Sequence, residues 1–299
     1  MKKLSFIILA AVSITLFISS CSGNNSGQSS GSGSAEAEDA MSLLKPVPPK
    51  REGPVRILFI GNSHTEFIVS IPYLFDALCS ENDKSVEIAT LVEMGADIDE
   101  ILDANKSDLD DYFSIADPDG NCFDFVILQE KTNTAVNRLN SYKKNCKKVA
   151  DLVLKNSPDA AFYVYELMPP EKIANKGDFI KYKNKSLKNA IEVAKSLPNA
   201  GVLPIGSAVA DAYNGKDGYI AIKGGKDLLR NNDLSLHMLN DAGFLASIIV
   251  YRTVYGETPV IPSTLPLATG TGDDDEIMML EVNKTISNPE ALLKIAAGY

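Results

Sequence analysis

The chain has 299 residues, with 29 basic and 39 acidic side chains and a formal net charge of −10. Hydrophobic residues make up 45% and charged residues 23%, which excludes a wholly disordered or collagen-like chain. Nucleic-acid binding needs clustered Lys and Arg, so the acidic balance disfavours that function class. The chain contains two histidines, His64 and His237, so a multi-histidine metal site is almost excluded.

The N-terminus is typical of an exported bacterial lipoprotein. Two lysines precede an apolar run over residues 4–18, and Ser-Ser-Cys21 follows the run. This is the pattern of a secretory signal, and the run is too short to span a membrane comfortably. We therefore expect residues 1–20 to be a lipoprotein signal peptide and Cys21 to be the lipid attachment point. An ordinary signal peptide or an uncleaved anchor is the alternative.

The next segment, residues 21–54, is rich first in Gly, Ser and Asn and then in Pro. Such a sequence cannot bury a core and is predicted to be a flexible tether. The predicted layout is a lipid, a tether and a single domain over residues 55–299. It indicates a periplasmic or cell-surface protein held at a membrane, with the outer membrane favoured. The oligomeric state stays open.

Apolar runs and helical periodicities alternate through the body. Strands are predicted at residues 55–60, 86–92, 125–128, 161–167 and 202–205. Helices are predicted at residues 66–81, 97–113, 139–156, 178–196 and 241–255, the last with Asn240 as N-cap and Gly256 beyond its end. This alternation predicts a three-layer α/β/α sandwich around a central, mainly parallel five-stranded sheet. Ligands of such folds bind outside the carboxyl ends of the strands.

Two segments in such positions carry nucleophile and base chemistry. The first strand ends in Gly-Asn-Ser63-His64-Thr, immediately before a helix. A serine there is most often a helix cap, but its hydroxyl can also face the cleft as a nucleophile. Late in the chain, Asp233 precedes His237 in a loop before the last predicted helix, residues 241–255. The order Ser, Asp, His recurs in hydrolytic triads.

These segments together resemble the SGNH (GDSL-like) hydrolases. The sequence ILFIGNSHT resembles the family's nucleophile motif, with Ser63 as nucleophile, and Gly95 matches the position of the oxyanion-hole glycine. The segment DFVILQE resembles the strand before the family's third motif, and LSLHMLNDAGFLA resembles its closing segment with His237. The resemblance covers residues 56–260 and implies a flavodoxin-like fold.

The resemblance also implies a chemistry for these residues. Ser63 is expected to attack an ester, with His237 as general base and Asp233 holding the imidazole. The backbone N–H groups of Ser63 and Gly95 and the side-chain amide of Gln129 are expected to form the oxyanion hole. The chemistry that the resemblance implies needs no metal or other cofactor.

Two positions depart from the family pattern. Gln129 stands where the family has an asparagine, which offers the same donor on a longer arm. Asp233 lies four residues before His237, whereas the family spacing is three, so a Ser–His dyad is the alternative to a triad. Two neighbours of the motifs also have open roles. His64 is expected either to contact substrate or to bond within its loop, and Glu130 either to line the pocket or to pair with a lysine such as Lys131.

Other features receive structural interpretations. Cys79 is expected to be a buried small hydrophobe, a Cys122–Cys146 disulfide is one option for an exported protein, and the acidic run 273–276 is expected to be a solvated helix start rather than a calcium site.

The implied function is a membrane-anchored serine esterase acting on small acyl esters, with O-acetyl groups on glycans as the expected substrate. The alternative is a catalytically degenerate lipoprotein of the same fold that binds glycans at the surface.

Overall fold

The computed structural model describes residues 41, 44–50, 52–117, 120–169, 176–231, 237–270 and 276–299. The predicted signal peptide, Cys21 and most of the predicted tether lie outside the described residues. Asp233 and residues 273–275 of the acidic run lie outside them as well.

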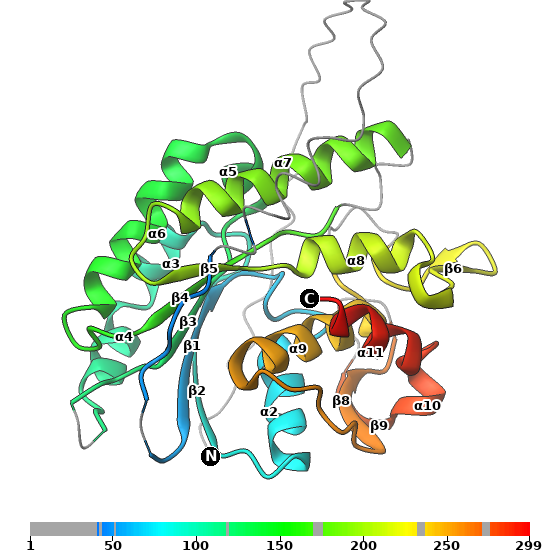
Figure 1. Ribbon diagram of the computed structural model, residues 1–299, viewed down its shortest axis with the longest axis horizontal. Helices are drawn as coiled ribbons and strands as arrows, with labels where there is room; N and C mark the ends of the chain where they lie inside the picture. Colours follow the sequence, from blue (N-terminus) through cyan, green and yellow to red (C-terminus); the bar gives the residue numbers. More distant parts are fainter. Residues whose placement is uncertain are drawn as a thin grey trace, which may run out of the picture.

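A five-stranded parallel sheet forms the centre of the molecule (Figure 1). Its strands are β1 (Val55–Gly61), β2 (Val86–Val92), β3 (Phe125–Leu128), β4 (Ala161–Tyr165) and β5 (Ala200–Leu203). The spatial order is β2-β1-β3-β4-β5, and every neighbouring pair is parallel. The predicted sheet is confirmed. Because the order reverses between β1 and β3, the carboxyl ends of these two strands border the ligand crevice expected of such a fold.

Burial explains the sequence character of each strand. β3 is buried along its whole length and β1 at every position after Val55, as continuous apolar runs of central parallel strands require. β2 lies at one edge, where Glu87 is exposed and half-buried and buried positions alternate from Ile88 onward.

The opposite edge strand, β5, is covered by the end of the predicted tether. Residues 44–47 lie beside it, where Val47 N–H donates to Asn199 Oδ1 at 2.7 Å and Asn199 Nδ2 donates to Val47 O at 2.9 Å. A Cβ on Gly201 would come within 2.8 Å of Pro46 Cδ, so glycine permits this close approach. The cover protects backbone groups that an open edge strand would expose to other chains. This last part of the tether is therefore held on the body.

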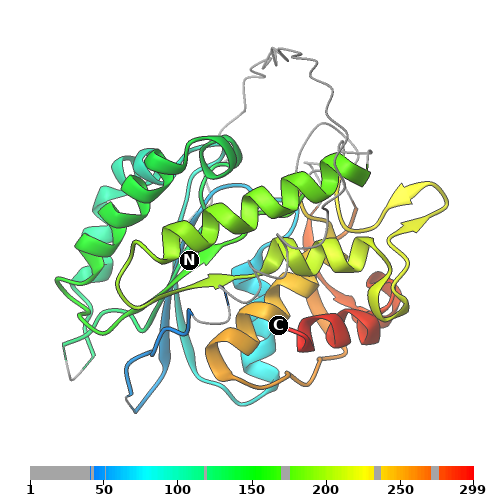
Figure 2. The same ribbon diagram turned by 45° about the horizontal axis from the view of Figure 1, so that its top comes forward.

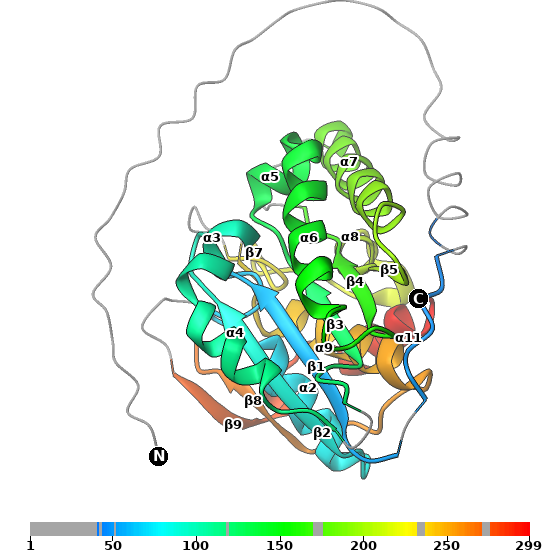
Figure 3. The same cartoon turned by 90° about the vertical axis from the view of Figure 1, so that its left-hand side faces the viewer.

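Helices cover both faces of the sheet (Figures 1 and 3). One face carries α3 (Ile98–Ala104), α4 (Lys106–Phe113), α5 (Thr132–Asn137), α6 (Leu139–Val153) and α7 (Lys176–Ala194). The other carries α2 (Ile71–Glu81), α8 (Ile205–Tyr213), α9 (Asn240–Tyr255) and α11 (Pro289–Ala297). The predicted three-layer architecture is confirmed.

Several helix boundaries differ from prediction because side chains intervene. α2 begins five residues later than the apolar spacing indicates, since Ser70 Oγ accepts the Tyr73 N–H and caps the helix there. The predicted 97–113 helix is two helices that meet at Asn105. Asn240 is the first residue of α9 rather than its cap. Its amide exchanges two hydrogen bonds with the backbone of Ala268 instead.

The later part of the chain adds elements that the sequence patterns did not predict. The β6 (Ile222–Lys223) and β7 (Lys226–Asp227) hairpin projects beyond α8 (Figure 2). β8 (Thr264–Ala268) and β9 (Ile277–Glu281) form a second hairpin, followed by α10 (Val282–Thr285) and α11. Within the described ranges, no helix combines the length and apolar character that a membrane crossing requires.

The three described cysteines, Cys79, Cys122 and Cys146, are buried thiols. The Cys122–Cys146 disulfide is therefore not formed in this structure, and the prediction of a buried Cys79 is confirmed.

Candidate active site

Ser63 lies in a tight turn at the carboxyl end of β1, which we call the Ser63 turn (residues 61–65). Asn62 organises it: its carbonyl accepts the N–H groups of Thr65 (2.8 Å) and Glu66 (3.2 Å), and its Oδ1 accepts the His64 N–H (3.2 Å). Ser63 is half-buried and makes no hydrogen bond to any described residue. Its hydroxyl and its N–H are therefore available to a ligand.

Gln129 supports this turn from beneath. Its Oε1 accepts the Asn62 N–H at 2.7 Å and the Thr65 hydroxyl at 3.2 Å, and its Nε2 donates to Glu130 O at 2.6 Å. A Cβ on Gly61 would meet Thr65 Oγ1 at 2.0 Å and Gln129 Oε1 at 2.8 Å, so only glycine fits there. Gln129 is 0% exposed. The predicted oxyanion-hole contact of its amide is corrected, because this buried amide is bonded to the protein and has no surface that a substrate could reach.

The loop after β2, residues 93–97, lies against the Ser63 turn and is called the Gly95 loop. Glu93 N–H donates to Gly61 O at 3.2 Å, and Asn62 Nδ2 donates to Ala96 O at 2.9 Å. Gly95 is exposed and has φ +69°, a left-handed conformation that favours glycine. The glycine that the sequence singled out therefore sits on a loop tied directly to the candidate nucleophile's turn.

His237 meets the segment that bears Ser63 through a cluster of aromatic rings. The His237 ring lies 4.4 Å from the ring of Phe67 and 5.8 Å from that of His64, measured between centroids. Three residues into α9, Gly243 packs so closely on Val69 that a Cβ there would lie 2.4 Å from Val69 Cγ1. The segment after Ser63 and the segment that carries His237 therefore meet in the fold, and the pairing of Ser63 with His237 stays a prediction.

A buried ion pair anchors the strand pairing that carries His237. Leu239 N–H donates to Leu229 O and Asn231 N–H donates to His237 O, at 2.9 and 3.0 Å. Between these bonds, Arg230 is 1% exposed and reaches Asp227 Oδ2 through Nε (2.9 Å) and Nη2 (2.6 Å).

Two further contacts hold the Arg230 guanidinium. Its Nη1 donates to Pro169 O at 3.0 Å, and its Cζ lies 4.3 Å from the centroid of the Tyr213 ring. Sequence reasoning missed this clamp. The i,i+3 spacing of Asp227 and Arg230 was its only signal, and that spacing is common on exposed surfaces.

The carboxylates near His237 in sequence have other partners. Asp227 binds Arg230, and Asp241 accepts the Tyr219 hydroxyl at 2.5 Å and the Ser287 N–H at 3.2 Å. Burial is the main reason that the pKa of Asp241 rises to about 6. Asp233 lies outside the described residues, so its role as the third member stays a prediction.

The ring of His64 is buried and hydrogen-bonds to α5. His64 is 8% exposed, and its Nε2 lies 3.1 Å from Thr132 Oγ1. Burial, and secondarily the neighbouring His237, lower the pKa of His64 to about 3. His64 is therefore neutral near pH 7. The ring bonds to Thr132, the first residue of α5, and not within its own loop as one prediction had it, and its contact with substrate stays a prediction.

Glu130 is 0% exposed, which corrects its predicted contact with substrate. Its carboxylate accepts hydrogen bonds from inside the protein, and burial raises its pKa to about 7. The predicted pairing with Lys131 takes a different form. The Lys131 backbone N–H donates to Glu130 at 2.7 Å, whereas the Lys131 ammonium lies 3.9 Å from Glu100.

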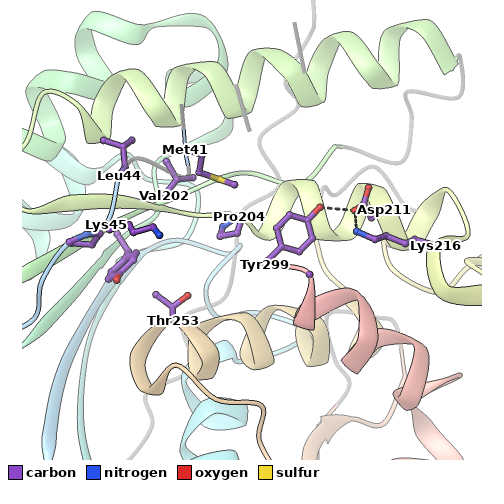
Figure 4. A pocket seen from close by; sticks show the side chains of 12 residues that line it. Met41, Leu44, Lys45, Val202, Pro204, Asp211, Lys216, Thr253 and Tyr299 are labelled. Atoms are coloured by element: carbon purple, nitrogen blue, oxygen red, sulfur yellow. Dashed lines mark hydrogen bonds and ion pairs between the residues drawn. The ribbon is translucent and has the colours of Figure 1, made fainter. Parts of the chain in front are cut away.

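A separate cavity of about 610 Å³ lies between residues 41 and 44–46 on one side and the C-terminal residues on the other (Figure 4). Asp211 there accepts hydrogen bonds from Lys216 and the Tyr299 hydroxyl, at 2.8 and 2.7 Å. None of its lining residues belongs to the Ser63 turn, the Gly95 loop or the segment around His237. Among the described residues, no group of three or more His, Cys, Asp and Glu side chains is placed to hold a metal ion.

Comparison with known proteins finds matches among solved structures only; no family model and no curated protein matches. A DUF4886 family protein from Bacteroides uniformis is 13% identical, with 82% of this chain and 94% of that chain covered, at a TM-score of 0.54. A proposed SGNH hydrolase from Slackia heliotrinireducens is 18% identical (68% and 100% covered, TM-score 0.49). The psychrotrophic esterase EstA from Pseudoalteromonas sp. is 14% identical (67% and 97% covered, TM-score 0.46).

At these identities the likeness concerns the fold. The chain shares its fold, a five-stranded parallel sheet flanked by helices, with the DUF4886 family protein. Other structural neighbours, at low identity, are SGNH/GDSL-like hydrolases and esterases.

Proposed function

We propose that this protein is a serine esterase that removes small acyl groups, O-acetyl groups above all, from glycans. The observation that carries the proposal is the ring cluster of His64, Phe67 and His237, which places a histidine beside the turn that bears Ser63. The hydroxyl of Ser63 makes no hydrogen bond to any described residue, so it is available to react with an ester.

In the proposed reaction, Ser63 Oγ attacks the acyl carbonyl carbon while His237 takes the hydroxyl proton. The N–H groups of Ser63 and Gly95 hold the negative oxygen of the tetrahedral intermediate. The intermediate collapses to an acyl-serine, and the alcohol leaves with the proton that His237 returns. Water then attacks the acyl-serine by the same route and releases the acid. Asp233 orients the imidazole of His237 in this scheme.

The substrate class is supported by the layout that the sequence predicts. A lipid on Cys21 and a tether over residues 21–54 would keep the enzyme at a periplasmic or outer-membrane surface, beside surface glycans. The acidic chain charge of −10 gives no attraction to polyanions, which is compatible with neutral acetylated sugars.

The test compares variants of the full-length protein on 4-nitrophenyl acetate and on a panel of acetylated sugars. Ser63→Ala and His237→Gln are each expected to lower kcat by about 10⁴-fold or more. Ser70→Ala is the matched control, because this buried serine of the same segment caps α2 instead of facing a ligand. It is expected to lower stability by about 1 kcal/mol and to leave kcat within about threefold.

Equal rates for the wild type and Ser63→Ala would overturn the esterase proposal and favour the glycan-binding alternative. In that alternative, both proteins bind the acetylated sugars and neither hydrolyses them. A separate variant, Asp233→Asn, decides between triad and dyad. A loss of about 10⁴-fold in kcat indicates a triad, and near wild-type turnover leaves a Ser–His dyad.

A further inference from the structure

Glu130 joins three elements at the base of the candidate site. It is the second residue after β3, and its Oε1 accepts the N–H groups of Ile98 at 3.2 Å and Lys131 at 2.7 Å. Its Oε2 accepts from Asn145 Nδ2 on α6 at 2.9 Å. Ile98 is the first residue of α3, immediately after the Gly95 loop. One buried carboxylate therefore binds the end of that loop to the sheet and to α6.

The preceding residue makes the matching contacts with the nucleophile. Gln129 holds the Ser63 turn through Asn62 and Thr65, and its Nε2 donates to the carbonyl of Glu130. Two consecutive side chains thus hold the two pieces of backbone that the proposed oxyanion hole needs. Gln129 holds the one that carries Ser63, and Glu130 holds the one that follows Gly95.

We infer that Glu130 is a positioning residue that fixes the Gly95 loop relative to the Ser63 turn and so sets the direction of the Gly95 N–H. The inference rests on the proposed esterase function. An oxyanion donor must lie about 2.7–3.1 Å from the developing charge, and a misplacement of about 1 Å can cost about 100-fold in rate. Glu130 acts through the loop, since it is buried and does not touch substrate.

The geometry indicates that hydrogen-bond acceptance, rather than charge, does this positioning. If Oε2 carries a proton, the Asn145 amide can turn its oxygen toward it, and Oε1 still accepts from both backbone N–H groups. A glutamine at this position offers the same arrangement. Glu130→Gln is therefore expected to preserve the contacts, whereas Glu130→Met fills the volume and accepts nothing.

The experiment measures kcat, KM, Tm and amide hydrogen exchange over residues 93–98 in the full-length protein. Glu166→Met is the matched control. Glu166 is also fully buried and also accepts a helix N-terminal N–H, from Ser207 at 2.8 Å, but it binds α8 and neither loop of the site. Both Met variants are expected to lower Tm.

Glu130→Met is expected to lower kcat on 4-nitrophenyl acetate by about 30–100-fold at nearly unchanged KM, and to speed exchange over residues 93–98. Glu130→Gln and Glu166→Met are expected to keep kcat within about threefold of wild type. Ile98→Pro gives a second measurement that leaves Glu130 in place. It removes the donor at a first helical position where proline is tolerated, but it also removes the buried Ile98 side chain, so it is compared with Ile98→Ala. Ile98→Pro is expected to lower kcat well below that of Ile98→Ala.

Wild-type kcat in Glu130→Met, or an equal loss of kcat in Glu166→Met, would overturn the positioning role while the esterase stands. Absence of wild-type turnover on every ester, together with a Ser63 that does not react with an alkyl phosphonate, would instead overturn the proposed function. In that case hydrogen exchange still tests whether Glu130 fixes the Gly95 loop. Unchanged exchange over residues 93–98 in Glu130→Met would refute that role.

Discussion

Gly243→Ala tests whether the contact between α9 and the segment after Ser63 sets the position of His237. A Cβ at Gly243 would lie 2.4 Å from Val69 Cγ1 and 3.0 Å from Val69 Cβ. Carbon atoms rest about 3.5–4.0 Å apart, so about 1 Å of separation must open. Residues 241–251 of α9 are buried, which leaves the helix little room to move away.

Overpacking of this kind costs about 1–3 kcal/mol, and a domain of this size loses about 2–4 °C of Tm per kcal/mol. We therefore expect a Tm lower by about 2–12 °C in a thermal melt followed by circular dichroism. Val69 lies two residues from Phe67, whose ring contacts His237. A 1 Å displacement passed to that contact is expected to lower kcat/KM on 4-nitrophenyl acetate by about 100-fold.

Val69→Ala supplies the control, because it removes the methyl group nearest the new Cβ. The double variant is expected to recover at least about 1 kcal/mol relative to the sum of the two single effects. If the two effects add, or if Gly243→Ala has wild-type stability and activity, the close packing of these residues does not position His237 and the reasoning is refuted.

Two further predictions concern buried charges. Arg230→Met leaves the Asp227 carboxylate buried without its cation, so the free energy of unfolding in urea should fall by about 3–5 kcal/mol. Adding Asp227→Asn should restore part of that free energy, and a double variant as unstable as Arg230→Met would contradict the prediction. Burial raises the pKa of Glu166 from 4.5 to about 7, so the native state binds more protons than the unfolded state between these values and stability falls as pH rises from 5 to 8. Glu166→Gln can still hydrogen-bond with Ser207 but does not titrate, so the decrease in unfolding free energy between pH 5 and 8 should be smaller by up to about 3 kcal/mol. Urea unfolding at the two pH values measures this, and a pH dependence equal to that of the wild type would contradict the prediction.

The parallel sheet was predictable because its strands are short apolar runs, and burial on both faces demands that composition. The start of α2 was not. Residues 66–70 have helical apolar spacing, yet Asn62 draws the backbone into a turn and Ser70 caps the helix afterwards. Spacing reports which residues face a core, whereas the first helical residue depends on individual side-chain hydrogen bonds.

The candidate site shows the same division. The sequence by itself singled out the positions after β1, β2 and β3 and the late histidine, because motif order and strand ends can be read along a chain. It did not show on which side of the backbone Gln129 and Glu130 lie. The structure buries both side chains beneath the loops, where they hold backbone groups instead of substrate.

Tertiary structure also decided what anchors His237. The Asp227–Arg230 pair and the contact of Gly243 with Val69 depend on segments that meet only after folding, so no local pattern predicts them. The sequence determined the sheet, the candidate nucleophile and the candidate base, because these follow from local composition and order. The placement of each supporting side chain, inward or toward the cleft, was decided by the packing of distant segments.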